Sequence, residues 1–203
     1  EFDWAEDELA RCARQEIVSQ GVEPAVVKSL RGNLTEHGGL REEATSLPRL
    51  PGGRKRADKK GADLLLLTGN AIRAEAPEVI QSMADVLDVA GEDWTVLSEE
   101  TAAGTELYDL GYADDASTQA RRLAETVIAS RAKRVVFLST ADFRTAQKWF
   151  SQWGVELPSS LELEHACQYL ARRAGKLHFR VPPPALTGYH DCAWLGRGLG
   201  IYE

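Results

Sequence analysis

The sequence predicts an α/β fold: a Rossmann-like half domain in which a mostly parallel sheet has flanking helices, preceded by a short helical arm. Three observations predict it. From residue 61 onward, short apolar runs alternate with longer segments of helical periodicity, as in βαβ units. In residues 5–37, by contrast, the apolar side chains follow helical spacing throughout. A charged, turn-rich segment separates these two parts.

The first part, residues 1–60, is expected to be a helical arm followed by a linker. Pro24 suits the first turn of a second helix, because a helix does not use the backbone donor that proline lacks at that position. The chain then becomes charged and rich in turn residues up to Gly61, which places the domain boundary there. The apolar positions are Leu9, Cys12, Ala13, Ile17 and Val18 in the first helix, and Val26, Val27, Leu30 and Leu34 in the second.

The second part, residues 61–203, is expected to form the sheet and its helices, with the second half of the domain incomplete. Pro182, Pro183 and Pro184 force an extended chain before the last strand. Strands are predicted at residues 63–67, 94–97, 134–138 and 185–190. Helices are predicted at residues 76–90, 120–128, 142–153 and 164–174.

The composition argues against several classes of protein. A formal charge of -7 argues against nucleic-acid binding, because phosphate affinity requires clustered lysines and arginines. No apolar run approaches the ~20 residues that cross a bilayer, and no secretory signal is visible. Cys12, Cys167 and Cys192 are too far apart for a disulfide framework or a zinc ribbon. We therefore expect a cytoplasmic protein with reduced thiols.

Four loops follow the predicted strands, at the edge of the sheet where ligands bind in α/β folds. We expect these loops to converge on one pocket. Gly69 and Gly104 have no side chain, so the backbone can approach a ligand closely at these turns. The loop residues of interest are Gly69-Asn70, Ala102-Ala103-Gly104, Ser139 to Asp142, and His190 to Arg197.

The loops are also evenly spaced. There are 31 residues between Asn70 and Ala102, and 35 between Ala103 and Ser139. This spacing resembles that of the cysteine-rich CCG domain of heterodisulfide-reductase-like iron-sulfur oxidoreductases, in which Gly-Cys, Cys-Cys-Gly and Cys-x-x-Cys follow successive strands. The segment 190–197, with its His-Asp and Leu-Gly-Arg, is similar to the one that opens the second half of a complete domain.

The resemblance implies cluster-ligand positions at Asn70, Ala102, Ala103, Ser139 and Asp142, where the family has cysteines. Iron-sulfur clusters are held by cysteine thiolates. Among these five residues only Asp142 offers an anionic donor. We therefore expect no cofactor in this chain, with an iron-sulfur cluster in the parent protein or in a partner as the remaining option.

The last loop offers three further candidates, His190, Asp191 and Cys192. Together with Asp142 they supply carboxylate, imidazole and thiolate groups, which zinc accepts as ligands. Alternatively, His190 and Asp191 only orient the loop through local hydrogen bonds. Cys192 is either a reactive thiol, if a following helix amino terminus lowers its pKa, or a small apolar group packed beside Trp194.

The expected function is that of a non-catalytic scaffold module in a heterodisulfide-reductase-like electron-transfer complex, with its cluster ligands largely lost. Its partners would be other subunits of the redox complex, either ferredoxin-like or flavoproteins. The alternative is a redox-active electron-transfer or thiol-disulfide reductase subunit whose ligands are completed by Cys192 or by a partner chain. A third interpretation is that the cysteines were removed by engineering, as the adjacent Ala102 and Ala103 suggest.

Overall fold

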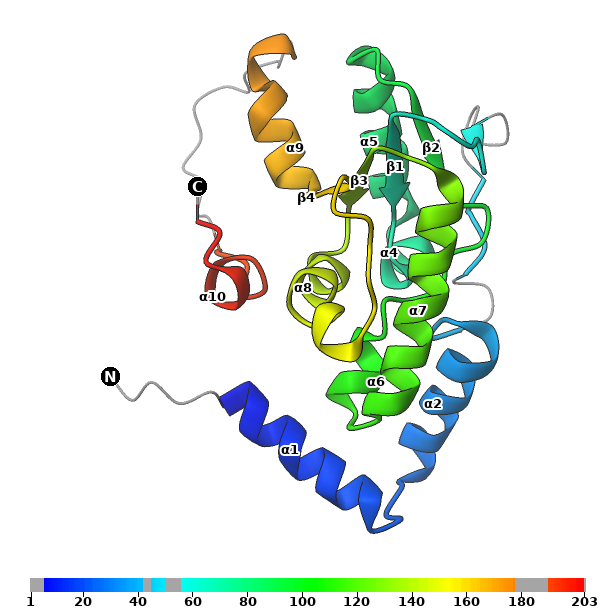
Figure 1. Ribbon diagram of the computed structural model, residues 1–203, viewed down its shortest axis with the longest axis vertical. Helices are drawn as coiled ribbons and strands as arrows, with labels where there is room; N and C mark the ends of the chain where they lie inside the picture. Colours follow the sequence, from blue (N-terminus) through cyan, green and yellow to red (C-terminus); the bar gives the residue numbers. More distant parts are fainter. Residues whose placement is uncertain (1–5, 42–44, 50–55, 178–189, 203) are drawn as a thin grey trace.

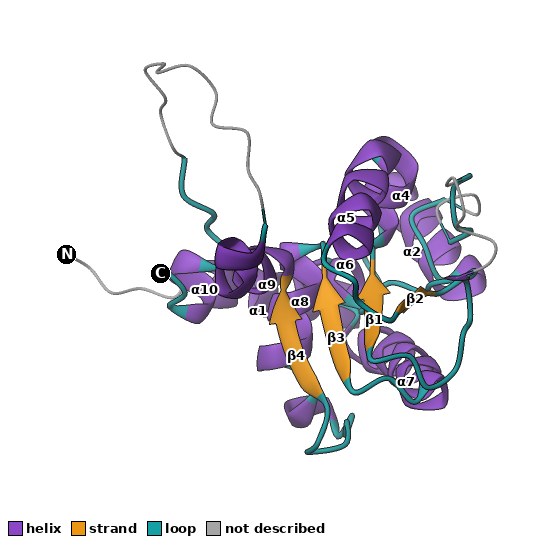
Figure 2. Ribbon diagram, turned by 90° about the horizontal axis from the view of Figure 1, so that it is seen from above, coloured by secondary structure: helices purple, strands orange, loops and turns teal. Residues whose placement is uncertain are grey.

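The computed structural model describes residues 6–41, 45–49, 56–177 and 190–202. Its centre is a parallel four-stranded sheet in the order β2-β1-β3-β4. The strands are β1 (Leu64–Leu67), β2 (Trp94–Val96), β3 (Arg134–Phe137) and β4 (Glu162–His165). They lie side by side and point the same way (Figure 2). Helices flank this sheet and a helical arm precedes it, so the predicted α/β fold is confirmed.

The longer helices follow the strands as the periodicity predicted, whereas the short helices at residues 70–75, 105–109 and 196–199 were not predicted. The segments predicted at 76–90 and 120–128 correspond to α5 and α7, while the segment predicted at 142–153 is α8 followed by a 3-10 turn. No helix in the described part of the chain is both long and apolar enough to cross a membrane. The helices are α4 (Asn70–Glu75), α5 (Pro77–Val89), α6 (Thr105–Asp109), α7 (Ala113–Ser130), α8 (Thr140–Lys148), α9 (Ala166–Arg173) and α10 (Gly196–Leu199), with 3-10 turns η2 (Ser151–Trp153) and η3 (Ala174–Lys176).

The core lies on both faces of the sheet. Side chains alternate between faces along a strand, so β1 contributes Leu64 and Leu66 to one face and Leu65 and Leu67 to the other. The first face packs against α5 and α9, and the second against α7 and α8. A strand buried on both faces reads as a continuous apolar run, as expected for a parallel sheet.

The fourth strand differs from the prediction. β4 occupies Glu162–His165, and α9 begins only at Ala166 rather than at Glu164. Glu164 is buried in β4 because Arg134 and Arg172 each approach its carboxylate to 3.1 Å. A strand that buries a paired glutamate has no apolar run, which is why periodicity did not find it. The strand predicted at 185–190 lies outside the described residues except for His190, which is in a loop.

The helical arm consists of α1 (Glu6–Ser19) and α2 (Ala25–His37). In α2, Leu34 is fully buried and packs in one cluster with Leu107 and Ala116 of the following α/β part. The linker beyond the arm also contacts this part, because the backbone N–H of Leu47 donates to the carbonyl of Ser98 over 2.8 Å. The described residues of the arm and linker thus pack directly against the α/β part.

The first helix buries a different face from the one that most of its apolar residues suggest, although Val18 is partly buried against the cluster around Leu34. Leu9 and Ile17 remain exposed, whereas the buried residue of α1 is Arg11. The guanidinium of Arg11 lies 4.5 Å from the ring centre of Tyr108 and 4.8 Å from that of Trp149. Cation-π contacts of this kind compensate part of the cost of burying a charge. The helix was therefore predicted, but not the face that it buries.

Candidate functional site

The loops after β1, β2 and β3 meet at one point of the sheet edge. The chain runs from β1 to β2 on one side and places β3 on the other, so this point is the switch point at which α/β sheets bind ligands. Gly69 has φ +80°, and a Cβ built on it would lie 2.7 Å from the Cβ of Ser139. The sequence predicted that a ligand could approach the backbone closely at Gly69. In the structure, this close approach is made instead by atoms of the loop that contains Ser139.

Asp142 is the centre of this meeting point. The residue as a whole is 8% exposed. The backbone N–H of Ala103 and the hydroxyl of Ser139 donate to its carboxylate, and the hydroxyl of Thr105 approaches Oδ1 to 3.4 Å. The backbone N–H of Asp142 donates to Oγ of Ser139 over 3.2 Å, which caps α8. Two predicted ligand positions, 103 and 139, therefore both bond to a third, Asp142.

The carboxyl group of Asp142 has an unusually high pKa. Burial, together with the nearby carboxylates of Glu106 and Glu100, raises the pKa of Asp142 to about 7. Burial also raises the pKa of Glu106, and Oε2 of that residue has no hydrogen-bond partner among the described residues. Asp142 is therefore largely protonated in mildly acidic solution. The contacts described above for its carboxyl group are with protein atoms.

The two remaining ligand positions of the resemblance meet at the end of α2. The side-chain amide of Asn70 and the backbone N–H of Ala102 each donate to the carbonyl of Gly38 over 2.8 Å. Asn70 is buried, and its Oδ1 has no partner among the described residues. These two positions hold the arm against the sheet edge. The structure thus brings all five positions to one edge, in two hydrogen-bonded groups.

A buried ion pair beside the site was missed by the sequence analysis. Nη2 of Arg73 lies 3.1 Å from Oε2 of Glu100. The backbone N–H groups of Thr68 and Gly69 donate to the same carboxylate over 3.0 and 2.6 Å. Nη2 of Arg73 also donates to the carbonyl of Leu97 over 2.8 Å. In the sequence, Glu100 is visible only as a charged residue that follows a strand. A charged residue at such a place is also common in an ordinary solvent-exposed loop, so it does not indicate a buried ion pair.

Of the three candidate residues in the fourth predicted loop, Cys192 is the one that reaches this edge. His190 and Asp191 are exposed, while Cys192 is half-buried. Burial raises the pKa of the Cys192 thiol, but hydrogen bonds from the N–H groups of Leu195 and Trp194 and from the Thr140 hydroxyl outweigh burial, so that its pKa is lowered. Thr140 is the first residue of α8 and follows Ser139.

The last described segment of the chain packs against α8. The helix α10 lies beside α8 (Figure 1). The guanidinium of Arg144 lies 4.8 Å from the ring centre of Trp194, and its Nη2 is 2.8 Å from Oδ2 of Asp7 in α1. Trp194 thus packs against an arginine, and one residue of α8 contacts both the first helix and the last loop.

An iron-sulfur cluster does not fit the residues at the sheet edge. The five ligand positions offer no thiolate, and the amide of Asn70 and the carboxyl of Asp142 are bonded to protein. Cys12 and Cys167 are exposed on α1 and α9, and Cys192 lies beside Thr140. None of the three thiols joins the groups formed by these five positions.

The zinc site suggested by Asp142, His190, Asp191 and Cys192 does not fit either. Within the described ranges, no three side chains of His, Cys, Asp or Glu lie close enough together to hold a metal ion. A structural zinc site needs four such ligands in tetrahedral geometry.

Comparisons of the chain with protein-family models, with curated proteins and with solved structures found no match. Function is therefore inferred from the residues and their geometry.

Proposed function

We propose that the chain is a non-catalytic scaffold module of an iron-sulfur oxidoreductase complex, related in design to the CCG domain, in which hydrogen-bonded protein groups take the place of a cluster. Its role is to hold and position other subunits of the complex, which carry the redox groups. One observation carries the proposal: positions that are far apart in sequence and spaced like cluster ligands lie together at the switch point of a parallel sheet.

The groups at these positions suit a structural role. The carboxyl group of Asp142 receives hydrogen bonds from Ala103 and Ser139, and so ties the loops after β2 and β3 together. Asn70 and Ala102 tie the sheet edge to Gly38 at the end of α2. A metal cluster crosslinks loops in the same sense, because several distant residues share one centre. The polar contacts here supply that crosslink without a cofactor.

The second candidate function is a redox-active subunit that uses Cys192. The observation in its favour is the set of hydrogen bonds that lowers the pKa of this thiol, since the thiolate is the reactive form. A thiol-disulfide reaction would need a second thiol from a partner chain, because Cys12 and Cys167 lie on other helices. A chain in which Cys192→Ser abolishes thiol-dependent electron transfer would favour this candidate over the scaffold.

Restoring the cysteines tests the proposal directly. The variant carries cysteine at all five ligand positions: Asn70→Cys, Ala102→Cys, Ala103→Cys, Ser139→Cys and Asp142→Cys. After anaerobic incubation with ferrous iron and sulfide, we expect bound iron and sulfide with visible charge-transfer absorption in the variant, and neither in the native chain. The native chain and the variant are compared by circular dichroism, so that a failure to fold is recognised.

The matched control places five cysteines at exposed positions away from the sheet edge, where no cluster is expected. These are Glu36→Cys, Ser82→Cys, Glu125→Cys, Gln152→Cys and Glu156→Cys. Stoichiometric iron in the native chain would overturn the scaffold proposal. A folded restored variant that binds no more iron than the control would overturn the relationship to the CCG domain.

A further inference from the structure

The face of α1 that points away from the rest of the chain is apolar. The helix forms the lower edge of the molecule in Figure 1. An α-helix turns once in about 3.6 residues, so the side opposite the buried Arg11 carries Leu9, Ala13 and Ile17. Leu9 is 62% exposed and Ile17 is 47% exposed, and Ala13 between them is exposed as well. We call these three residues the outer stripe of α1.

The opposite face of α1 is bound to the rest of the chain by charged groups. The guanidinium of Arg11 packs against the aromatic rings described above. Nη1 of Arg14 donates to the carbonyl of Asp109 over 2.8 Å. Two ion pairs join the helix to α8: Asp7 with Arg144 at 2.8 Å and Glu8 with Lys148 at 3.6 Å. Both cations of α1 and two of its carboxylates therefore hold the helix in place.

The remaining charges of α1 lie at the two ends of the outer stripe, and both are negative. Glu6 and Glu16 are exposed, and neither forms an ion pair with another described residue. The side-chain amide of Gln20 donates to Oε1 of Glu16 over 2.8 Å, but it brings no positive charge. The outer face of α1 therefore presents an apolar stripe bordered by carboxylates, without a cation.

This arrangement differs from that of an ordinary surface helix, which turns its apolar side toward the core. Eight large apolar residues are exposed in the described part of the chain, and four of them lie within residues 9–26: Leu9, Ile17, Val22 and Val26. The backbone N–H of Val22 donates to the carbonyl of Ile17 over 3.2 Å, so exposed apolar residues continue past the end of α1. Exposed apolar residues that gather within a polar border are typical of a protein–protein interaction site.

We propose that the outer stripe binds an amphipathic helix of another subunit, whose apolar face is bordered by lysines or arginines. The two apolar faces pack together, and the basic side chains pair with Glu6 and Glu16. A helix of 14 residues offers about 21 Å of contact. A second copy of α1 is a poor occupant, because its outer face carries the same carboxylates and no cation. The inference rests on the proposed function, since it names the surface through which the scaffold holds another subunit.

The test uses three fluorescently labelled helical peptides of about 20 residues, long enough to cover α1. The lysine peptide carries leucines and alanines on one face and lysines beside that face. The glutamate peptide has the same apolar face with glutamates in place of the lysines. The serine peptide keeps the lysines but has serines in place of the leucines, so it reports attraction by charge alone.

Each peptide is titrated with the full chain at about 0.15 M salt and followed by fluorescence anisotropy. We expect saturable binding of the lysine peptide. Its dissociation constant should be at least about tenfold lower than that of either other peptide, because only this peptide matches both the stripe and its border.

Two double variants test the surface of α1 itself. Leu9→Ser with Ile17→Ser removes the large side chains of the stripe, and we expect at least about tenfold weaker binding of the lysine peptide. Glu6→Gln with Glu16→Gln removes only the charges of the border. We expect this variant to bind the lysine peptide about threefold or more weakly and to discriminate less against the glutamate peptide. Circular dichroism shows whether each variant keeps the fold.

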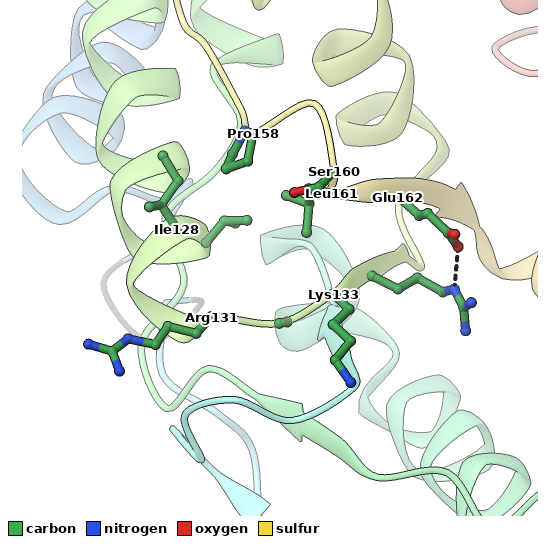
Figure 3. Close-up of a pocket in the computed structure, with 10 residues that line it drawn as sticks. Ile128, Arg131, Lys133, Pro158, Ser160, Leu161 and Glu162 are labelled. Atoms are coloured by element: carbon green, nitrogen blue, oxygen red, sulfur yellow. Dashed lines mark hydrogen bonds and ion pairs between the residues drawn. The ribbon is translucent and has the colours of Figure 1, made fainter.

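The matched control replaces exposed apolar residues on two other helices. Val89→Ser lies at the end of α5, and Ile128→Ser lies on α7 beside a hollow at the start of β3 and β4 (Figure 3). The cation that this hollow shares with Glu162 is Arg134, and the two are paired at 3.0 Å. Neither position belongs to an apolar stripe bordered by unpaired carboxylates, so we expect the control variant to bind the lysine peptide as the native chain does.

The proposal is overturned if the lysine peptide binds no more tightly than the serine peptide, or if the variant at Leu9 and Ile17 binds it as tightly as the native chain does. Sedimentation equilibrium tests the other occupant. A dimer of the native chain that the same two substitutions dissociate would assign the stripe to a second copy and would also overturn the proposal. None of these results changes the iron content by which the proposed function is tested, so the two can fail separately.

Discussion

Arg73 and Glu100 form an ion pair, with 3.1 Å between Nη2 and Oε2, whose side chains are only 0% and 3% exposed. The pair joins α4 to the loop after β2, and the carboxylate also accepts the backbone N–H groups of Thr68 and Gly69. Because these donors include the turn after β1, the pair fixes the position of two of the three loops at the candidate site. The candidate site is therefore supported by the buried Glu100 carboxylate, whose charge is paired with Arg73.

Breaking this pair should cost much more stability than breaking an exposed one. We expect Arg73→Met to lower the free energy of unfolding by about 3–5 kcal/mol, because it leaves the Glu100 carboxylate buried without its cation. The matched substitution Lys133→Met removes an exposed partner of Asp63 and should cost less than about 1 kcal/mol. Urea unfolding of both variants measures the difference. Equal, small losses would show that the buried pair does not hold the loops.

The turn before α6 should accept only glycine. Gly104 has φ +94°, and a Cβ there would lie 2.5 Å from the carbonyl oxygen of Ala116. We expect Gly104→Ala to cost roughly 2–5 kcal/mol, from backbone strain plus a clash with a helix backbone. Gly154→Ala is the control, since Gly154 has φ +66° but open space around it; it should cost only about 1–2 kcal/mol. Thermal unfolding that ranks these variants the other way would contradict the prediction.

The buried carboxyl of Asp142 should make stability depend on pH. Burial with nearby carboxylates raises its pKa from 3.8 to about 7 in the folded chain. The unfolded chain therefore loses this proton at lower pH than the folded chain does. The stability contributed by the neutral group is fully present below the unfolded pKa and is lost as pH rises toward about 7.

Asp142→Asn should remove this dependence. The free energy of unfolding of the variant, relative to that of the native chain, is expected to increase between pH 4 and pH 7 by at most about 1.4 kcal/mol per pH unit and then to level off. Urea unfolding at a series of pH values measures this difference, in which the other titrating groups largely cancel. A difference that falls with rising pH would mean that Asp142 is ionised in the fold well below pH 7.

Cys192 should react as a thiolate at lower pH than an ordinary thiol. Burial raises its pKa, but hydrogen bonds from Leu195, Trp194 and Thr140 lower the pKa by more. In a chain that carries Cys12→Ser and Cys167→Ser, the rate of alkylation by iodoacetamide against pH reports this single thiol. We expect Thr140→Val to move the midpoint to higher pH, and Thr126→Val on α7 to leave it unchanged. An unmoved midpoint in Thr140→Val would remove the support for a reactive Cys192.

Much of the fold was predictable because it depends on local patterns. The apolar run at β1 and the periodic apolar residues of α5 fixed these two elements to within a few residues, whereas α7 begins at Ala113, before the predicted segment 120–128. The exception was β4, whose Glu164 is buried only because Arg134 and Arg172 pair with it. Neither arginine can be recognised as a partner from the sequence, because each lies on a different element of the fold.

For the candidate site, the sequence by itself determined which residues stand at the ends of the strands, and hence that Asn70, Ala103 and Ser139 belong to loops at one edge of a parallel sheet. Only the tertiary structure decided what those loops contain. It buried Asp142 between them and placed Arg73 against Glu100. The physical reason is that a pattern of apolar residues reports burial by the hydrophobic effect, whereas a buried charge is stabilised by partners that only folding brings near it.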